Sequence, residues 1–264
     1  MSILQLDKVH SAPWGKPLLE NINFELKPGN ILGIIGPNGA GKTSLLNTIV
    51  GDCPVESGQL LLSSKTLAQW NRRELARHLA FLPQLSLLNF PYTVEEVILL
   101  GRSPHDTGAE HDRKILKEVL ALADIGHLQG RLYTRLSGGE KQRVQLARIY
   151  SQIWQDDSLE GKLLLLDEPT AALDIQHQQG TAAAISTLAD RGCAVVLVIH
   201  DFNTIASLAD QLVVLDNGRQ VAHGAPRQVL SEKLFRETFS ADLTVMQHPN
   251  RDQLLIISNS GVPV

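Results

Sequence analysis

The chain has 264 residues, 43% of them hydrophobic, which is enough for one sizeable core or for a core with a lobe inserted into it. The formal net charge of −4 argues against a basic nucleic-acid surface, so we expect no nucleic-acid partner. No apolar run approaches the ~18 residues that span a bilayer, Met1 leads directly into a strand-like segment, and Cys53 and Cys193 fit a reducing compartment. We therefore expect a cytoplasmic protein.

The first two elements are expected to be antiparallel strands. Residues 3–9 and 18–26 alternate between apolar and polar side chains, which is typical of strands with one solvated face. Three later segments are continuously apolar, which is typical of parallel strands buried on both faces: 31–36, 163–167 and 194–200. A helical pattern follows each of these three, at 41–51, 174–191 and 202–209. This alternation predicts an α/β core.

The middle of the chain is expected to be helical. Strand signals vanish between about residues 85 and 155, and apolar residues recur at helical spacing in 93–101, 109–125 and 139–155. We predict a single domain over 1–264, with a core formed by 1–84 and 156–264 and a helical lobe over 85–155. After the last core helix, 221–239 predicts a turn and a short helix, and 253–258 a final strand.

Residues 36–43 (GPNGAGKT) match the pattern G-x-x-x-x-G-K-[ST], and they follow a buried strand and open a helix. Glycines let the backbone turn its N–H groups toward phosphate oxygens, while Lys42 reaches the β- and γ-phosphates. The hydroxyl of Thr43 is placed to ligate Mg²⁺. The pattern predicts a nucleotide site formed by Gly36, Pro37, Asn38, Gly39, Ala40, Gly41, Lys42, Thr43 and Ser44.

Two carboxylates end the strand at 163–167. Ligands of open α/β sheets lie beyond the carboxyl ends of the strands, so Asp167 is a candidate second partner for Mg²⁺. Glu168 is a candidate general base that polarises the attacking water. An ordinary acidic turn at the end of a strand is the alternative interpretation.

His200 and Gln84 also follow apolar, strand-like segments. At the same sheet edge, the His200 imidazole is a candidate hydrogen-bond partner of the γ-phosphate, with a purely structural histidine as the alternative. Gln84 is a candidate to bind Mg²⁺ or the attacking water. The alternative is that it has no role at the site, and its spacing from the other motifs does not distinguish the two.

The helix expected over 139–155 begins with a pair of glycines. Ser137 and Glu140 fit a capping box, which places Gly138 and Gly139 in the first turn, where unpaired N–H groups point outward. Without side chains, such a helix start lets an anion approach closely. The phosphate loop already serves the nucleotide of the same subunit, so this second phosphate-seeking site makes sense if it binds a nucleotide held by another copy.

Taken in order, these motifs resemble the ATP-binding cassette family: the phosphate loop at 36–43, Gln84, LSGGE at 136–140, LLLLDE at 163–168, AALD at 171–174 and His200. The resemblance covers essentially the whole chain. It implies a P-loop NTPase core with an antiparallel β subdomain and an inserted α-helical lobe, and it implies ATP and Mg²⁺ as cofactors. It also implies a head-to-tail homodimer with two ATP molecules, each between one phosphate loop and residues of the opposite subunit: Ser137, Gly138, Gly139, Glu140 and Asp174.

Two positions need comment within this resemblance. Trp14 corresponds to the aromatic residue that stacks on adenine, and a surface tryptophan beside a turn is the alternative. Ala171 replaces a serine often found in the loop before Asp174, which puts one hydroxyl across the dimer interface in doubt.

The chain carries one cassette and no membrane segment, so a transporter would need separate transmembrane permease subunits. This chain would then lie at the cytoplasmic face of the inner membrane, with a periplasmic substrate-binding protein as an indirect partner. Residues 67–84 and 93–105 resemble importers of haem, siderophores and cobalamin, and 90–97, 149–162 and 248–257 are more similar to haemin importers. Residues 85–105 are expected to form part of a groove for a permease helix, with lobe core as the alternative. A soluble cassette ATPase outside transport is the competing class.

Overall fold

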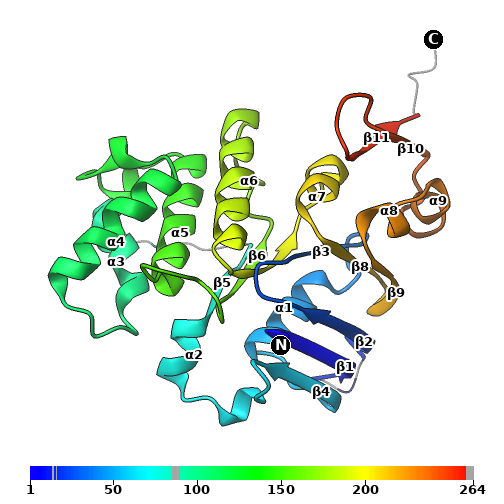
Figure 1. The fold of residues 1–264 in the computed structure, drawn as a ribbon, viewed down its shortest axis with the longest axis horizontal. Helices are drawn as coiled ribbons and strands as arrows, with labels where there is room; N and C mark the ends of the chain where they lie inside the picture. The colour runs from blue at the N-terminus through cyan, green and yellow to red at the C-terminus, as the bar shows by residue number, and fades with distance from the viewer. Residues whose placement is uncertain (14, 16, 85–87, 89, 260–264) are drawn as a thin grey trace.

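The computed structural model describes residues 1–13, 15, 17–84, 88 and 90–259. Within these residues, nine strands form one sheet in the order β4-β1-β2-β9-β8-β3-β7-β6-β5, and two further strands form a hairpin near the C-terminus (Figure 1). The strands are β1 (Leu4–Ser11), β2 (Leu19–Leu26), β3 (Ile31–Ile35), β4 (Ser57–Leu62), β5 (Leu79–Leu82), β6 (Leu163–Asp167), β7 (Ala194–Val198), β8 (Gln211–Asp216), β9 (Arg219–Gly224), β10 (Leu243–Gln247) and β11 (Leu254–Ser258). The α-helices are α1 (Lys42–Val50), α2 (Arg72–His78), α3 (Val94–Leu99), α4 (Ala109–Leu122), α5 (Gly138–Ile153), α6 (Ile175–Asp190), α7 (Phe202–Leu208), α8 (Pro226–Val229) and α9 (Glu232–Phe239).

The centre of the sheet is parallel, as predicted. β3 pairs with β7 and β8, β7 pairs with β6, and β6 pairs with β5, all in the parallel sense. Every residue of β3, β6 and β7 is buried. Strands covered on both faces need continuous apolar sequence, which explains why these three could be recognised without any alternation. Their carboxyl ends meet at one edge of the sheet and position the candidate site.

The N-terminal strands form the antiparallel part of the sheet. The two antiparallel strands expected from the sequence are present as β1 and β2, and they pair with each other; β4, which the sequence did not predict, pairs with the other edge of β1. Apolar residues of these strands form one buried cluster with α1 and with one face of the parallel strands. The helix α1 is thereby packed between the two parts of the sheet, which fixes the loop that precedes it.

The opposite face of the parallel strands is covered by helices. α3, α4 and α5 gather at one end of the molecule (green in Figure 1), and α6 lies beside them. Within the described part of 85–155 there is no strand, and only an isolated bridge between Thr93 and Leu132 occurs, in agreement with the predicted helical character. Apolar residues of these helices share one buried cluster with the parallel strands, so the lobe boundaries at 85 and 155 stay a prediction. None of the helices in the described residues is long and apolar enough to cross a membrane.

The C-terminal region differs in part from the prediction. The segment 221–239 contains the end of β9 and two helices, α8 and α9, rather than one short helix. The predicted final strand is present as β11, and it pairs with β10, which was not predicted. Three phenylalanines, Phe202, Phe235 and Phe239, pack their rings edge-on or tilted against one another and join α9 to α7.

Candidate functional site

The loop between β3 and α1 carries the predicted phosphate-binding residues. A Cβ on Gly36 would lie 2.3 Å from the carbonyl oxygen of Leu215, so only glycine fits there. Gly41 caps α1 in the left-handed region, with a φ of 100°. The side chain of Lys42 is buried under the loop, where its Nζ donates hydrogen bonds to the carbonyl oxygens of Gly36 and Pro37 at 2.8 and 2.9 Å. Burial lowers the pKa of Lys42, although Glu168 and Asp167 act in the opposite direction. The ammonium group therefore lies at the loop, held by two backbone carbonyl oxygens.

Thr43 and Asp167 meet at the carboxyl end of the sheet. The Thr43 hydroxyl donates to Asp167 Oδ2 at 2.9 Å, which joins the first turn of α1 to the end of β6. The other carboxylate oxygen of Asp167 is buried and has no hydrogen-bond partner among the described residues. Burial raises the pKa of Asp167, and the hydrogen bond from Thr43 acts against this shift. A carboxylate oxygen without a partner beside a threonine hydroxyl fits a hard divalent cation such as Mg²⁺.

Glu168 and His200 are in direct contact. The imidazole Nε2 of His200 lies 2.7 Å from Glu168 Oε1, a hydrogen bond in which the ring donates to the carboxylate. β6 and β7 are paired up to Asp167 and Val198, so each of the two residues lies just beyond the end of its strand. Glu168 adopts a left-handed conformation with a φ of 51°, which costs energy for a residue with a side chain and is common at functional sites.

A cavity of about 200 Å³ opens beside this pair. Its lining residues come from the loop after β6, from α6, from the loop after β7 and from α7: Glu168, Thr170, Ala171, Gln178, Ile199, His200, Asp201 and Thr204. Sequence reasoning did not select Thr170, Gln178, Asp201 or Thr204. Asp201 accepts hydrogen bonds from the backbone N–H groups of Asn203 and Thr204 and thereby caps α7, so a capping signal directly after His200 was available in the sequence.

Two candidate residues of the nucleotide site remain, Gln84 and Trp14. Leu82 of β5 pairs with Leu166 of β6. Gln84 follows Leu82 by two residues, and Glu168 follows Leu166 by two residues, so the two side chains come from equivalent positions beyond the ends of neighbouring strands. Gln84 is exposed, and no hydrogen bond joins it to another described residue. The structure therefore brings Gln84 to the same sheet edge, without a hydrogen bond to Asp167 or Glu168. Trp14 lies outside the described residues.

The glycine pair lies at the N-terminus of α5 with the expected capping box. The Ser137 hydroxyl accepts from the backbone N–H of Glu140 at 3.3 Å, and the Glu140 carboxylate accepts from the backbone N–H of Ser137 at 2.7 Å. A Cβ on Gly138 would meet no atom of the described residues within 4 Å, whereas a Cβ on Gly139 would lie 3.1 Å from the carbonyl oxygen of Ala172. Packing within the subunit thus explains Gly139 but leaves the space above Gly138 open.

Asp174 lies on the same part of the molecule as this helix start. It caps α6, and its Oδ1 accepts from the backbone N–H of His177 at 3.0 Å and contacts the ring Nδ1 at 2.7 Å. Both hydrogen bonds lower the pKa of Asp174, and the one from the backbone N–H has the larger effect. Gln142 of α5 donates to the carbonyl oxygen of Pro169 at 3.2 Å, which ties the loop before Asp174 to α5.

The candidate residues therefore form two groups. Among the described residues, no hydrogen bond or ion pair joins Ser137–Glu140 to the phosphate loop of the same chain. Sequence reasoning missed two residues of the second group: Gln142 connects α5 to the loop before Asp174, and His177 contacts the Asp174 carboxylate at the start of α6. The partner of Gln142 is set by tertiary packing, whereas His177 lies three residues after the cap Asp174, so its contact is local and could have been found from the sequence.

Comparisons with known proteins identify relatives along nearly the whole chain. Residues 19–171 match the ABC transporter family. The hemin import ATP-binding protein HmuV of Pseudomonas fluorescens is 45% identical over 256 residues, covering 97% of this chain and 100% of that protein. The protein of the same name from Gloeobacter violaceus is 46% identical over 245 residues, covering 92% of this chain and 89% of its own length.

Solved structures show the same fold. A chain of a metal-chelate type ABC transporter in an inward-facing conformation superposes with a TM-score of 0.79 at 25% identity, covering 97% of this chain and 96% of that one. A dimeric ATP-binding cassette in a post-hydrolysis state, bound to ADP and Pi, superposes with a TM-score of 0.72 at 25% identity, covering 85% of this chain and 99% of that one. The predicted α/β cassette fold is confirmed.

Proposed function

This chain belongs to the ABC transporter family as an ATP-hydrolysing, ATP-binding subunit, and we propose that it energises the import of haemin through a separate membrane permease. Support for haemin as the cargo comes from relatives that are 45% and 46% identical over nearly their full lengths and carry the name hemin import ATP-binding protein. The chain itself is the motor, so the cargo need not touch any of its residues.

One observation carries the enzymatic part of the proposal: two polar pairs lie at the ends of adjacent strands, beside the phosphate loop. Thr43 and Asp167 form the first pair at 2.9 Å, and Glu168 and His200 form the second at 2.7 Å. In a parallel sheet this edge is where ligands bind, and the N-terminus of α1 with its loop favours an anion there. The arrangement suits an ATP whose γ-phosphate points toward Glu168 and His200.

Each residue then has a defined task. The loop residues Gly36–Ser44 hold the phosphates, and Lys42 exchanges its two carbonyl partners for β- and γ-phosphate oxygens. Thr43 and Asp167, with Gln84 from the end of β5, would hold Mg²⁺, and the unpartnered oxygen of Asp167 supports this assignment. When bound, Mg²⁺ would neutralise the negative charge that develops on the phosphates during transfer.

The hydrolytic step falls to Glu168 and His200. Glu168 polarises the attacking water as general base, and His200, released from the carboxylate, donates to the γ-phosphate. The left-handed backbone at Glu168 holds the carboxylate at the mouth of the 200 Å³ cavity. Trp14 is proposed to stack on the adenine by resemblance alone.

A second copy of the chain completes the site. Ser137, Gly138, Gly139, Glu140 and Asp174 would contact the ATP held by the opposite subunit. The open space above Gly138 supports this role, because none of the described residues fills it. A related cassette is dimeric in a state with bound ADP and Pi. Closure of two copies around ATP would couple hydrolysis to motion.

The permease would bind near the start of the helical region. Phe90, Tyr92 and Leu100 are exposed apolar side chains within or beside the segment predicted to receive a permease helix, and such anchors suit a helix in a groove. The protein would then lie at the cytoplasmic face of the inner membrane, and a periplasmic substrate-binding protein would be reached only through the permease. No nucleic-acid partner is proposed.

A ferric siderophore or cobalamin is the alternative cargo. The similarity to a metal-chelate type transporter supports this alternative. A growth experiment separates these cargoes. The chromosomal copy is replaced by Glu168→Gln, and iron is supplied only as haemin or only as a ferric siderophore, with cobalamin-dependent growth as a third condition. Glu160→Gln, a change at an exposed glutamate, is the matched control.

Failure of Glu168→Gln on haemin alone is the expected result. Failure on another source would keep the importer and replace its cargo, whereas normal growth on all three would contradict the proposed import role. A soluble cassette ATPase outside transport would also fail to co-purify with a polytopic membrane protein in detergent.

A further inference from the structure

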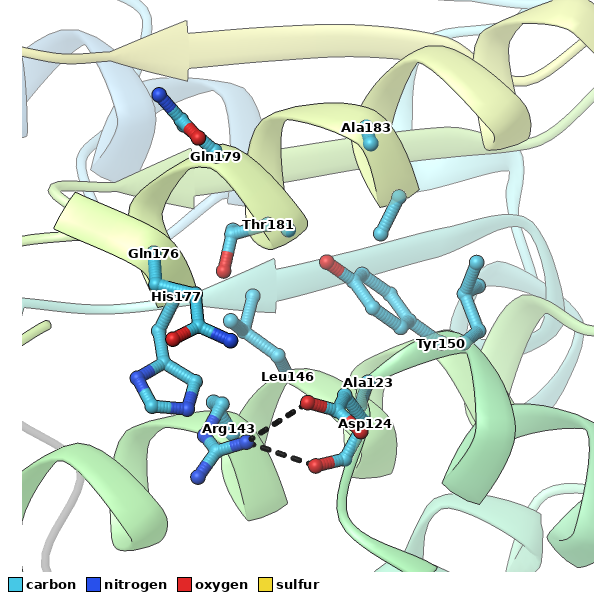
Figure 2. A pocket seen from close by; sticks show the side chains of 13 residues that line it. Ala123, Asp124, Arg143, Leu146, Tyr150, Gln176, His177, Gln179, Thr181 and Ala183 are labelled. Carbon is cyan, nitrogen blue, oxygen red and sulfur yellow. Dashed lines mark hydrogen bonds and ion pairs between the residues drawn. The ribbon is translucent and has the colours of Figure 1, made fainter. Parts of the chain in front are cut away.

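A second cavity, of about 420 Å³, lies between α5, α6 and the turn that follows α4 (Figure 2). It shares no lining residue with the cavity beside Glu168 and His200. Its volume falls within the roughly 300–1,000 Å³ that is usual for small-molecule sites. Apolar groups such as Leu122, Leu146 and Ala184 form much of its wall.

Two buried polar groups in this wall have no partner among the described residues. The Tyr150 hydroxyl and the Nε of Arg143 are buried and make no hydrogen bond there, and both side chains are more than nine-tenths buried, at 1% and 6% exposure. Figure 2 shows the Tyr150 hydroxyl directed from α5 toward Thr181 on α6. Because nearly all buried polar groups in proteins are paired, two unpaired donors beside one cavity indicate a partner from outside the chain.

The donors define the chemistry of that partner. Arg143 is permanently charged, and its Nη1 is already used on the backbone oxygen of Asp124 at 2.7 Å, with the Asp124 carboxylate at 3.8 Å. Burial raises the pKa of Tyr150, so its hydroxyl stays a neutral donor. Asp124 is the only acidic residue among the described residues that line the cavity, and it already faces Arg143. An oxygen acceptor is favoured and a cation is not.

We propose that this cavity is a binding site for a small carboxylic acid with an apolar body, whose carboxylate accepts hydrogen bonds from Arg143 Nε and the Tyr150 hydroxyl. The apolar body packs against the leucine and alanine side chains of the wall. Both donor atoms are covered by their neighbours, so this binding requires a side-chain shift that opens them to the carboxylate.

Such a ligand would act on the dimer. The wall residues Arg143 and Tyr150 belong to the helix that begins at Ser137, and the wall residue His177 holds Asp174 through its ring nitrogen. A molecule between α5 and α6 therefore changes the relation of the two elements that would face the partner's ATP. This coupling rests on the proposed two-subunit site, while the binding itself does not.

Three probes of one shape test the binding: 3-phenylpropionate, 3-phenylpropionamide and 3-phenylpropylamine, titrated into the nucleotide-free protein by calorimetry or by ligand-observed NMR. We expect the carboxylate to bind most tightly and the amine not to bind. Absence of saturable binding by the carboxylate, or equal binding by the amine, would overturn the proposal.

Variants locate the binding. Tyr150→Phe removes one donor and should weaken 3-phenylpropionate about tenfold without lowering Tm, because it also removes an unpaired buried hydroxyl. Gly180→Leu should abolish binding, since a side chain at Gly180 enters open space at the cavity and replaces a poor helix former. Ala182→Leu, on the same helix but outside this cavity, is the matched control. Unchanged binding in both Tyr150→Phe and Gly180→Leu would place the probe elsewhere and overturn the proposal.

The coupling has its own readout. The affinity of Glu168→Gln for 3-phenylpropionate is measured with and without MgATP, with the oligomeric state followed by light scattering. If binding and dimer formation are coupled, the affinity for 3-phenylpropionate must differ with and without MgATP. By reciprocity, the probe must also shift the ATP concentration needed for dimer formation. Equal affinities in monomer and dimer would overturn the coupling. Failure of the dimer to form would overturn the two-subunit site and the coupling together, and it would leave the binding result unaffected.

Discussion

Asp167 illustrates at the scale of one residue how a binding site costs stability. Its second carboxylate oxygen is buried without a partner among the described residues, and burial raises its pKa. Asp167→Asn removes the charge at nearly the same size, so we expect the nucleotide-free protein to gain about 1 kcal/mol, or a few degrees in Tm. The same variant should lose Mg²⁺-dependent ATP hydrolysis. Calorimetric unfolding and a phosphate-release assay measure the two effects.

The stabilisation by Asp167→Asn should depend on pH. A carboxyl whose folded-state pKa is raised above its unfolded value is disfavoured as the ion, so its cost is fully present above the folded pKa. As pH falls through that pKa, the native carboxyl takes up a proton and the advantage of asparagine shrinks. A Tm difference that grows toward acid, or an Asp167→Asn protein that unfolds more easily at neutral pH, would contradict this account of the site.

Glu168 tests the chemistry more directly. Glu168→Gln keeps the shape of the side chain and its contact with His200 but removes the basic oxygen, so hydrolysis should fall at least ~100-fold while ATP is still bound. Equilibrium binding of a fluorescent ATP analogue and steady-state phosphate release measure these separately. Lys42→Ala serves as the contrasting control, because it should weaken nucleotide binding itself. Near-normal turnover in Glu168→Gln would assign the base to another residue.

At the scale of elements, the start of α5 combines two kinds of glycine. A Cβ at Gly138 meets no described atom within 4 Å, so Gly138→Ala should stabilise the subunit by up to about 1 kcal/mol through helix propensity. A Cβ at Gly139 lies 3.1 Å from the Ala172 carbonyl oxygen, so Gly139→Ala should gain less or lose stability. If the helix start approaches the partner's ATP, Gly138→Ala should nevertheless weaken the MgATP-dependent dimer.

Urea unfolding of the two variants measures the first effect, and size-exclusion chromatography of each in a Glu168→Gln background measures the second. Gly138→Ala that forms the dimer as readily as the parent would show that the open space above this residue has no role in assembly. The comparison uses two adjacent positions of one turn, so differences in helix propensity largely cancel.

The sequence predicted the elements whose signals are local and strong. β3, β6 and β7 are fully buried runs, and α5 carries both a capping box and a long apolar stripe. β9 was missed because its residues alternate without a clear apolar face and its position depends on pairing with β8. The turn between them contains Asn217 and Gly218, both at positive φ, which is a hairpin signal that the sequence did contain.

The candidate site shows the same division. Lys42, Thr43, Asp167, Glu168 and His200 could be selected because each follows a recognisable strand or opens a recognisable helix. The pairing of Glu168 with His200 and the unpartnered oxygen of Asp167 could not be read from the sequence, because both depend on the register of neighbouring strands and on burial. The cavity between α5 and α6 had no sequence signal, since its wall joins three elements that are adjacent only after folding.

At the scale of the whole molecule, the candidate residues form two groups that no hydrogen bond or ion pair of the described residues joins within one chain. One group surrounds the phosphate loop, and the other joins the start of α5 to the loop before α6 through Gln142 and Gly139. A site divided in this way works when two copies are arranged head to tail, so that each group of one copy meets the other group of its partner. The division makes a prediction that no single-subunit site can satisfy.

Two inactive variants should restore each other when mixed. Lys42→Ala damages only the phosphate loop, and Gly138→Trp is chosen to block only the helix start, where a Cβ would meet no described atom within 4 Å. A mixed dimer pairs both damaged halves in one site and leaves the other site intact. Since half of the randomly formed dimers are mixed, up to about one quarter of the wild-type ATPase activity should return.

The Lys42→Ala/Gly138→Trp double variant, mixed with the inactive Glu168→Gln protein, leaves no intact site and should stay inactive. ATPase activity that does not recover in the first mixture, although an affinity tag on one variant co-purifies the other and so detects mixed dimers, would mean that each subunit completes its own site.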